Sequence, residues 1–187
     1  SYPEPSPRSL EVSLAEQLGI TAEEVMVTNG ATEAIYLVAH SLEGKYSAIF
    51  SPSFSEYADA ARLYRHTLSS FCQWPEAPQG AQAIWCGNPN NPTGQVIPKK
   101  ELVEYIQKHP EQVFVFDQSY ASFSPKEVLS AREALSLGNV ILVQSLTKSF
   151  AIPGLRLGYL VSNAATLEGI RALSHPWSVN TLAQAYT

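Results

Sequence analysis

Two basic residues, Lys148 and Arg156, lie between an apolar run at 140–144 and a second one at 158–161. Lys and Arg side chains are mostly exposed in proteins, so a place on the surface is the simplest interpretation of both. A lysine at the end of a buried strand, however, loses hydration, which favours the neutral amine that a nucleophile needs. The guanidinium of Arg156 offers paired donors that suit a phosphate group. The two residues therefore indicate an amine nucleophile beside an anion-binding group.

An acidic and a phenolic side chain, Asp117 and Tyr120, follow the buried strand expected at 113–116. An Asp in this place often caps a turn, and a Tyr is often part of the core with its hydroxyl hydrogen-bonded. A carboxylate at a strand end also gains from a cationic partner, which makes Asp117 a candidate site residue.

Residues 87–94 read Gly-Asn-Pro-Asn-Asn-Pro-Thr-Gly. Asn-Pro and Thr-Gly pairs form turns, so a rigid loop would explain them. Two Asn-Pro pairs closed by Thr-Gly are nevertheless more particular than a turn requires. We therefore expect this loop, which contains Asn91, to be functional.

A glycine turn at Gly30 opens a helix at Ala31 and Thr32. The free N–H groups and the positive dipole end of a helix start suit a phosphate. An ordinary Thr cap is the alternative, and the turn alone does not decide between the two.

The elements that must hold these residues alternate between short apolar runs and helical patterns, which predicts a three-layer αβα fold with a mainly parallel sheet. Seven strands are expected, at 25–27, 48–50, 67–71, 83–86, 113–116, 140–144 and 158–161. Helices are expected at about 7–18, 32–42, 55–64 and 98–108 and after Asn163. Ligands of such sheets bind beyond the carboxyl ends of the strands, where the candidate residues lie. The sequence contains no GxGxxG, P-loop, HExxH or GxSxG motif.

Length and charge narrow the class of protein further. The 187 residues fit one large domain, and 12 basic against 17 acidic residues give a net charge of −5. Without a basic surplus, nucleic acid and anionic membranes are not expected partners. The chain begins without Met and stops within an expected helix, so we interpret residues 1–187 as a segment of a longer polypeptide.

Cys72 and Cys86 lie far apart without a CxxC pattern, so we expect two buried thiols in a reducing compartment and no metal site. No stretch has the roughly 18 apolar residues of a membrane helix, and the start does not resemble a signal peptide. The cytoplasm is the expected location. The four histidines show no pairing that assigns them a role.

Several motifs in order resemble the pyridoxal-phosphate (PLP) enzymes of fold type I, of the class I and II aminotransferase family. They are residues 2–5, 30–34, 52–57, 88–94, Asp117 with Tyr120, and 145–158. The resemblance implies that the chain is the PLP-binding large domain, and that an N-terminal arm and a smaller C-terminal domain lie outside it.

The resemblance also implies roles for individual residues. Lys148 would form the Schiff base with PLP and move protons, Asp117 would pair with the pyridine nitrogen, and Tyr57 would stack on the ring. Asn91 and Tyr120 would bind the phenolic oxygen. The phosphate would lie on the turn at Gly30 and the N–H groups of Ala31 and Thr32, with Ser145 and Arg156 completing its site. Tyr2 would reach the cofactor of a neighbouring subunit, so a homodimer is expected.

The resemblance implies a small, phosphorylated amino-acid substrate, because the motifs resemble two branches of the family that act on phosphorylated substrates. Residues 145–148, 151–154 and 176–180 favour the branch that decarboxylates threonine phosphate over the branch that transaminates histidinol phosphate. A scaffold that binds the cofactor without turnover is the third alternative. The family pattern Asp-Glu-Ala-Tyr is Asp-Gln-Ser-Tyr at 117–120, which changes the surroundings of the site.

Overall fold

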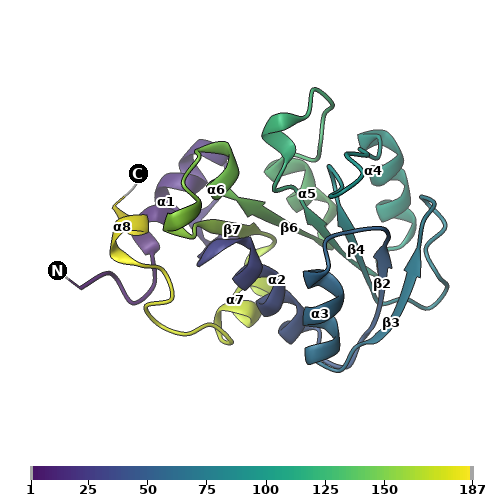
Figure 1. Ribbon diagram of the computed structural model, residues 1–187, viewed down its shortest axis with the longest axis horizontal. Coiled ribbons are helices and arrows are strands. Elements are labelled where there is room, and N and C mark those ends of the chain that lie inside the picture. The colour runs from purple at the N-terminus through teal and green to yellow at the C-terminus, as the bar shows by residue number, and fades with distance from the viewer. Residues whose placement is uncertain (1, 186–187) are drawn as a thin grey trace.

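A seven-stranded sheet forms the centre of the protein, which a computed structural model describes over residues 2–185 (Figure 1). Its strands are β1 (Val25–Thr28), β2 (Tyr46–Phe50), β3 (Thr67–Phe71), β4 (Ala83–Gly87), β5 (Val113–Asp117), β6 (Val140–Ser145) and β7 (Gly158–Val161). Their order across the sheet is β1-β7-β6-β5-β4-β2-β3. The five strands β3, β2, β4, β5 and β6, which are neighbours in that order, run parallel. Strand β7 is antiparallel to both of its neighbours, β6 and β1. The predicted mainly parallel sheet of seven strands is confirmed.

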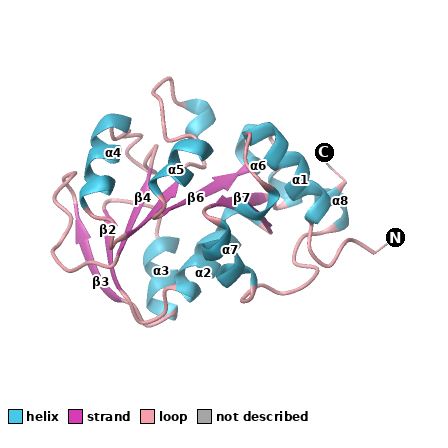
Figure 2. Cartoon of the chain, turned by 180° about the vertical axis from the view of Figure 1, so that it is seen from behind, coloured by secondary structure: helices cyan, strands magenta, loops and turns pink. Residues whose placement is uncertain are grey.

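Helices cover both faces of the sheet, as the two opposite views show (Figures 1 and 2). The helices are α1 (Arg8–Leu18), α2 (Gly30–Ser41), α3 (Glu56–Leu63), α4 (Lys99–Lys108), α5 (Ala131–Leu137), α6 (Leu146–Ser149), α7 (Ala164–Arg171) and α8 (Thr181–Gln184). Three 3-10 turns, η1 (Ala22–Glu24), η2 (Ala121–Phe123) and η3 (Pro153–Leu155), complete the structure. Helices α1, α4, α5 and α8 pack in one hydrophobic cluster, and α2, α3 and α7 pack in the other. The fold is therefore the expected three-layer αβα arrangement.

The apolar runs of the sequence become strands because both of their faces are buried. In β5, Phe114 and Phe116 belong to one cluster and Val115 to the other. Continuous apolar residues are needed where neither face of a strand meets water, which explains the absence of alternation.

A buried ion pair fixes β1 at the edge of the sheet. Glu11 of α1 is fully buried and accepts hydrogen bonds from the backbone N–H of Val27 (3.0 Å) and from Nη1 of Arg171 (2.6 Å). Arg171 also donates to the backbone oxygen of Val25. These contacts join α1 and α7 to β1, whose end leads into the turn at Gly30.

Some expectations differ from the structure. The second helix begins at Gly30 rather than at 32, and α5 and α6 were not predicted. A helix was expected at the end of the chain; α8 ends at Gln184, and residues 186–187 lie outside the described part of the chain. Cys86 is buried, but Cys72 is exposed, so the expectation of two buried thiols is wrong for Cys72. Cys72 follows Phe71 at the end of β3, where the chain leaves the edge of the sheet.

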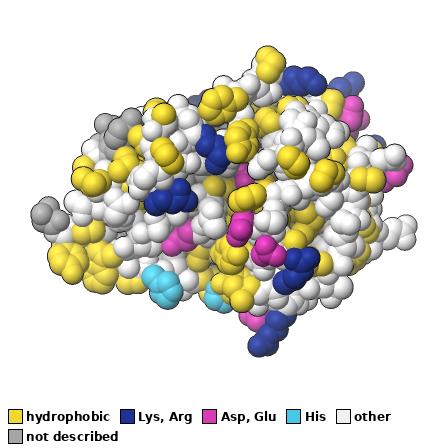
Figure 3. All heavy atoms as spheres, in the orientation of Figure 1, with side chains coloured by type: hydrophobic (Ala, Val, Ile, Leu, Met, Phe, Trp, Pro, Cys, Tyr) yellow, Lys and Arg dark blue, Asp and Glu magenta, His cyan; other side chains and the backbone are white. Residues whose placement is uncertain are grey.

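The surface of one face appears in the space-filling view (Figure 3). Lys and Arg side chains on this face are spread among acidic and apolar ones rather than gathered in one patch. Within residues 2–185, none of the helices has both the length and the hydropathy that crossing a membrane requires.

Candidate active site

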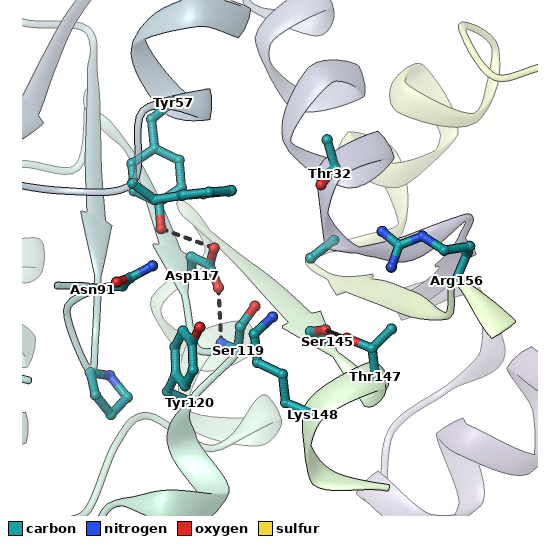
Figure 4. A pocket seen from close by; sticks show the side chains of 13 residues that line it. Thr32, Tyr57, Asn91, Asp117, Ser119, Tyr120, Ser145, Thr147, Lys148 and Arg156 are labelled. Atoms are coloured by element: carbon teal, nitrogen blue, oxygen red, sulfur yellow. Dashed lines mark hydrogen bonds between the residues drawn. The ribbon is translucent and has the colours of Figure 1, made fainter. Parts of the chain in front are cut away.

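A cavity of about 140 Å³ opens beyond the carboxyl ends of β4, β5 and β6 (Figure 4). Most of the residues predicted for the site line it. The lining residues are Ala31, Thr32, Phe54, Tyr57, Pro89, Asn91, Asp117, Ser119, Tyr120, Ser145, Thr147, Lys148 and Arg156. They come from six separate stretches of sequence, which the order and direction of the strands bring together beyond the carboxyl ends of β4, β5 and β6.

Asp117, the last residue of β5, is buried and held by two donors. Its Oδ2 accepts a hydrogen bond from the Tyr57 hydroxyl (2.9 Å), and its Oδ1 accepts one from the backbone N–H of Ser119 (2.9 Å). Burial and the neighbouring Asp117 carboxylate raise the pKa of Tyr57 well above its usual value, so the hydroxyl remains protonated and able to donate. The Tyr57 ring lies against Trp85, with ring centroids 6.2 Å apart. The carboxylate is thus fixed in direction before any ligand binds.

The loop after β4 is fastened to its surroundings through its asparagines. The N–H of Asn88 donates to the backbone oxygen of Asp117 (2.8 Å), and its Oδ1 accepts from the N–H of Ile97 (2.9 Å). Asn90 donates through Nδ2 to the backbone oxygen of Pro52 (2.8 Å). The loop is therefore held in place as the rigid-loop interpretation expects, and it presents Asn91 to the cavity, where its functional role stays a prediction.

Lys148 lies in the short helix α6, which starts directly after β6. Its Nζ is 5.0 Å from the centre of the Tyr120 ring, within the range of a cation–π contact. Figure 4 shows the Lys148 side chain between two groups of residues, with Asp117 and Tyr57 on one side and Arg156 on the other. An amine in this place can reach a ligand that spans both groups.

The start of α2 and the loop before β7 form the second group. Gly30 has a φ of +81°, and a Cβ built there would lie 3.0 Å from Nη2 of Arg156. A Cβ on Gly158 would lie 2.6 Å from the N atom of Ala31 and 2.7 Å from the carbonyl carbon of Gly30. The absence of both side chains lets β7 touch the helix start, which leaves the N–H groups of Ala31 and Thr32 near a guanidinium. This is a suitable place for an anion.

Hydroxyl groups complete the same side of the cavity. Ser145 and Thr147 are buried, and their side-chain oxygens lie 2.8 Å apart. Both residues line the cavity next to Arg156. Hydroxyl groups donate to phosphate oxygens, so these two side chains extend the anion site.

Two predicted residues lie outside the lining. Gly30 lies against the guanidinium of Arg156, which lines the cavity. Tyr2 is 87% exposed and contacts the ring of Trp177, with centroids 6.2 Å apart. Its ring is therefore free for contact with another molecule, and the structure does not bring it to the cavity of its own chain.

Four lining residues were not predicted: Phe54, Pro89, Ser119 and Thr147. Phe54 precedes Tyr57 by three residues and meets its ring edge to face, with centroids 5.9 Å apart. Phe54, Pro89 and Thr147 lie inside motifs noted in the sequence, so a closer reading of those motifs could have found them. Ser119 donates its backbone N–H to Asp117, and because almost any residue has such an N–H, the residue type at 119 does not predict this contact.

The comparisons with known proteins agree with this geometry. A family model described as aminotransferase class I and II matches residues 1–187. Histidinol-phosphate aminotransferase of Thermoanaerobacter sp. is 30% identical over 198 residues, covering 98% of this chain and 55% of that protein. The chain thus spans about half the length of this curated relative.

Two solved structures are also similar. L-threonine-O-3-phosphate decarboxylase from Porphyromonas gingivalis is 37% identical, with a TM-score of 0.95 over 98% of this chain and 58% of that chain. Histidinol-phosphate aminotransferase from Sinorhizobium meliloti, in complex with pyridoxal-5'-phosphate, has a TM-score of 0.89 at 18% identity, over 99% of this chain and 54% of that chain. At that identity the second likeness shows the fold alone.

Proposed function

This chain belongs to the class I and II aminotransferase family, and we propose that residues 1–187 are the cofactor-binding large domain of a longer pyridoxal-phosphate enzyme. The observation that supports this most is the position of Lys148, between a buried carboxylate and an anion site in one cavity. The relatives are about twice as long as this chain, in agreement with a domain that acts together with further sequence.

The residues of the cavity fit each chemical group of pyridoxal phosphate. The aldehyde needs an amine, which Lys148 provides. The pyridine nitrogen needs a carboxylate, and Asp117 is buried and fixed in direction by two hydrogen bonds. The phosphate needs donors, and the start of α2 provides them together with Arg156. When bound, the cofactor supplies an electron-accepting ring that stabilises negative charge at the Cα atom of an amino acid.

The protein's own residues then orient the reacting groups and move protons. Asp117 would hold the proton on the pyridine nitrogen, and the Tyr57 hydroxyl keeps that carboxylate in place. Asn91 and Tyr120 would bind the phenolic oxygen, and the ring of Tyr57 also faces the cavity. The free amine of Lys148 would take or return a proton at the Cα atom of the substrate.

We propose that the whole enzyme decarboxylates L-threonine O-3-phosphate and acts as a homodimer. The identity of 37% to a threonine-phosphate decarboxylase supports the substrate. The exposed Tyr2 ring, free to reach a partner subunit, supports the dimer. A histidinol-phosphate aminotransferase is the second candidate, favoured by the 30% identity to such an enzyme over 98% of this chain.

Borohydride reduction of the full-length protein with pyridoxal phosphate tests the cofactor site. Peptide mass spectrometry should then find the reduced cofactor on Lys148, and the Lys148→Ala variant should carry none. The Lys126→Ala variant, which changes an exposed lysine on a loop, is the control and should be labelled like the wild type. Label on another lysine, or none in the wild type, contradicts the proposed site.

Incubation with each candidate substrate separates the two activities. Threonine phosphate should release CO2 while the cofactor stays in its aldehyde form. Conversion of the cofactor to pyridoxamine phosphate by histidinol phosphate, without release of CO2 from threonine phosphate, would establish the aminotransferase instead.

A further inference from the structure

Gln118, the residue after Asp117, is 2% exposed, and all of its polar groups are hydrogen-bonded. Its N–H donates to the backbone oxygen of Val143 (2.8 Å), and its backbone oxygen accepts from the N–H of Ala121 (2.9 Å). Its Nε2 donates to the backbone oxygen of Leu129 (3.0 Å), and its Oε1 accepts from Nε2 of Gln144 (2.7 Å). One buried side chain therefore joins three segments of the protein.

Two of the three segments that this side chain joins carry the candidate catalytic groups. Gln118 lies between Asp117 and Tyr120 in the sequence, at the end of β5. Gln144 is the last residue but one of β6, and Lys148 follows in α6. The contact between the two amides thus connects the strand end bearing the carboxylate to the strand end bearing the amine.

The two side-chain hydrogen bonds together require an amide at position 118. Gln118 accepts a hydrogen bond from Gln144 and donates one to Leu129. A carboxylate of the same size can accept but cannot donate, so it would face the backbone oxygen of Leu129 without a hydrogen. Leaving a buried polar group without its partner is costly, and the turn is expected to shift in response.

We propose that the Gln118 side chain, hydrogen-bonded to both Gln144 and Leu129, is a positioning device that fixes the turn bearing Asp117 and Tyr120 relative to Lys148. The inference rests on the proposed function, because it assigns these residues to one cofactor. A purely structural role would stabilise the fold without affecting the binding of the cofactor.

A matched pair of substitutions, one at each end of β5, separates the two roles. Gln112 immediately precedes β5, is 6% exposed, and donates through Nε2 to the backbone oxygen of Ala81 (2.9 Å). It lies at the opposite end of β5 from the cavity. Gln112→Glu and Gln118→Glu therefore remove equivalent buried donors, one far from the cavity and one next to it.

The experiment uses the full-length protein, titrated with pyridoxal phosphate and monitored by absorbance, together with thermal unfolding of the cofactor-free form. Both variants should lower the melting temperature. Only Gln118→Glu should raise the Kd of pyridoxal phosphate, by about tenfold, which corresponds to about 1.4 kcal/mol. It should also change the pH dependence of the absorbance of the bound cofactor. Gln144→Leu, a change at a half-buried residue, should act in the same direction and decides the matter if Gln118→Glu does not fold.

Equal Kd values and spectra for the Gln118 and Gln112 variants would overturn the positioning role. A wild type that binds no pyridoxal phosphate would overturn the proposed function instead. In that case hydrogen exchange at the Ser119 N–H, which donates to Asp117, still tests the role of the Gln118 side chain. Exchange should be faster in Gln118→Glu than in Gln112→Glu, and equal exchange would show that the Gln118 amide does not hold the turn.

Discussion

The hydrogen bond from Tyr57 to Asp117 should contribute measurably to the stability of the cofactor-free protein, and Tyr57→Phe removes only the hydroxyl. The phenyl ring that remains keeps its contact with Trp85, so the substitution leaves no large cavity. A hydrogen bond to a charged group contributes about 1.5–3 kcal/mol when both partners are buried, as they are here. For a domain of this size, 1 kcal/mol corresponds to about 2–4 °C in melting temperature. We therefore expect a decrease of about 3–12 °C.

Tyr36→Phe is the matched control, since the Tyr36 hydroxyl also donates to a carboxylate, that of Glu56, at the same distance of 2.9 Å. This pair is only partly buried, so water replaces the lost bond and the decrease in stability should be clearly smaller. Urea unfolding of both variants and the wild type, without cofactor, measures the two losses. Equal losses, or a loss below about 0.5 kcal/mol for Tyr57→Phe, would refute the importance of burial for this bond.

The pH dependence of the same difference provides a second measurement. The pKa of Tyr57 is raised in the folded protein, so the stabilising bond is fully present below the pKa of an unfolded tyrosine, about 10. It is lost as the pH rises through the higher folded value. The advantage of the wild type over Tyr57→Phe should thus be constant between about pH 6 and pH 9 and should decrease only in strongly alkaline solution.

Three further changes test other parts of the structure. Gly158→Ala places a Cβ against the backbone of α2 and should abolish binding of pyridoxal phosphate in an absorbance titration, whereas Gly154→Ala, with nothing within 4 Å, should bind normally. Ser130→Ala removes the cap of α5 and should lower the free energy of unfolding in urea by about 1 kcal/mol; no change would show that the cap is dispensable. Burial lowers the pKa of His66 below 6.5, so folded protein binds this proton less readily than unfolded protein. The free energy of unfolding in urea should decrease as the pH drops below about 6.5. For the His66→Gln variant, this decrease should be less steep over the same range.

The sheet was predictable because burial on both faces forces each strand to be a short apolar run. All seven strands agree with their predicted ranges to within two residues. The missed helices are short: α6 has four residues, too few for an apolar stripe to appear. Helix α5 has only seven residues, although Ser130 and Glu133 form a capping box that marks its start. Local signals thus predict elements reliably only where enough residues repeat the pattern.

The predicted site residues could be placed near one another from strand ends alone, but their contacts could not. Tyr57 and Asp117 are 60 positions apart, and no local pattern shows that the hydroxyl of one meets the carboxylate of the other. The same holds for Gln118 and Gln144, which are 26 positions apart. Such bonds depend on strand order and register, which are properties of the whole sheet.

The direction of β7 explains how Arg156 reaches the carboxyl end of β6, where Lys148 lies. Gly158, the first residue of β7, pairs with Ser145 at the end of β6 and with Thr28 at the end of β1, because β7 is antiparallel to both. If β7 of four residues ran parallel to β6, its first residue would lie toward the amino end of β6, about 10 Å away at about 3.3 Å per residue. Arg156, two residues before this strand, would then lie far from the helix start at Gly30. The single strand that breaks the parallel order is therefore what brings the guanidinium to the anion site.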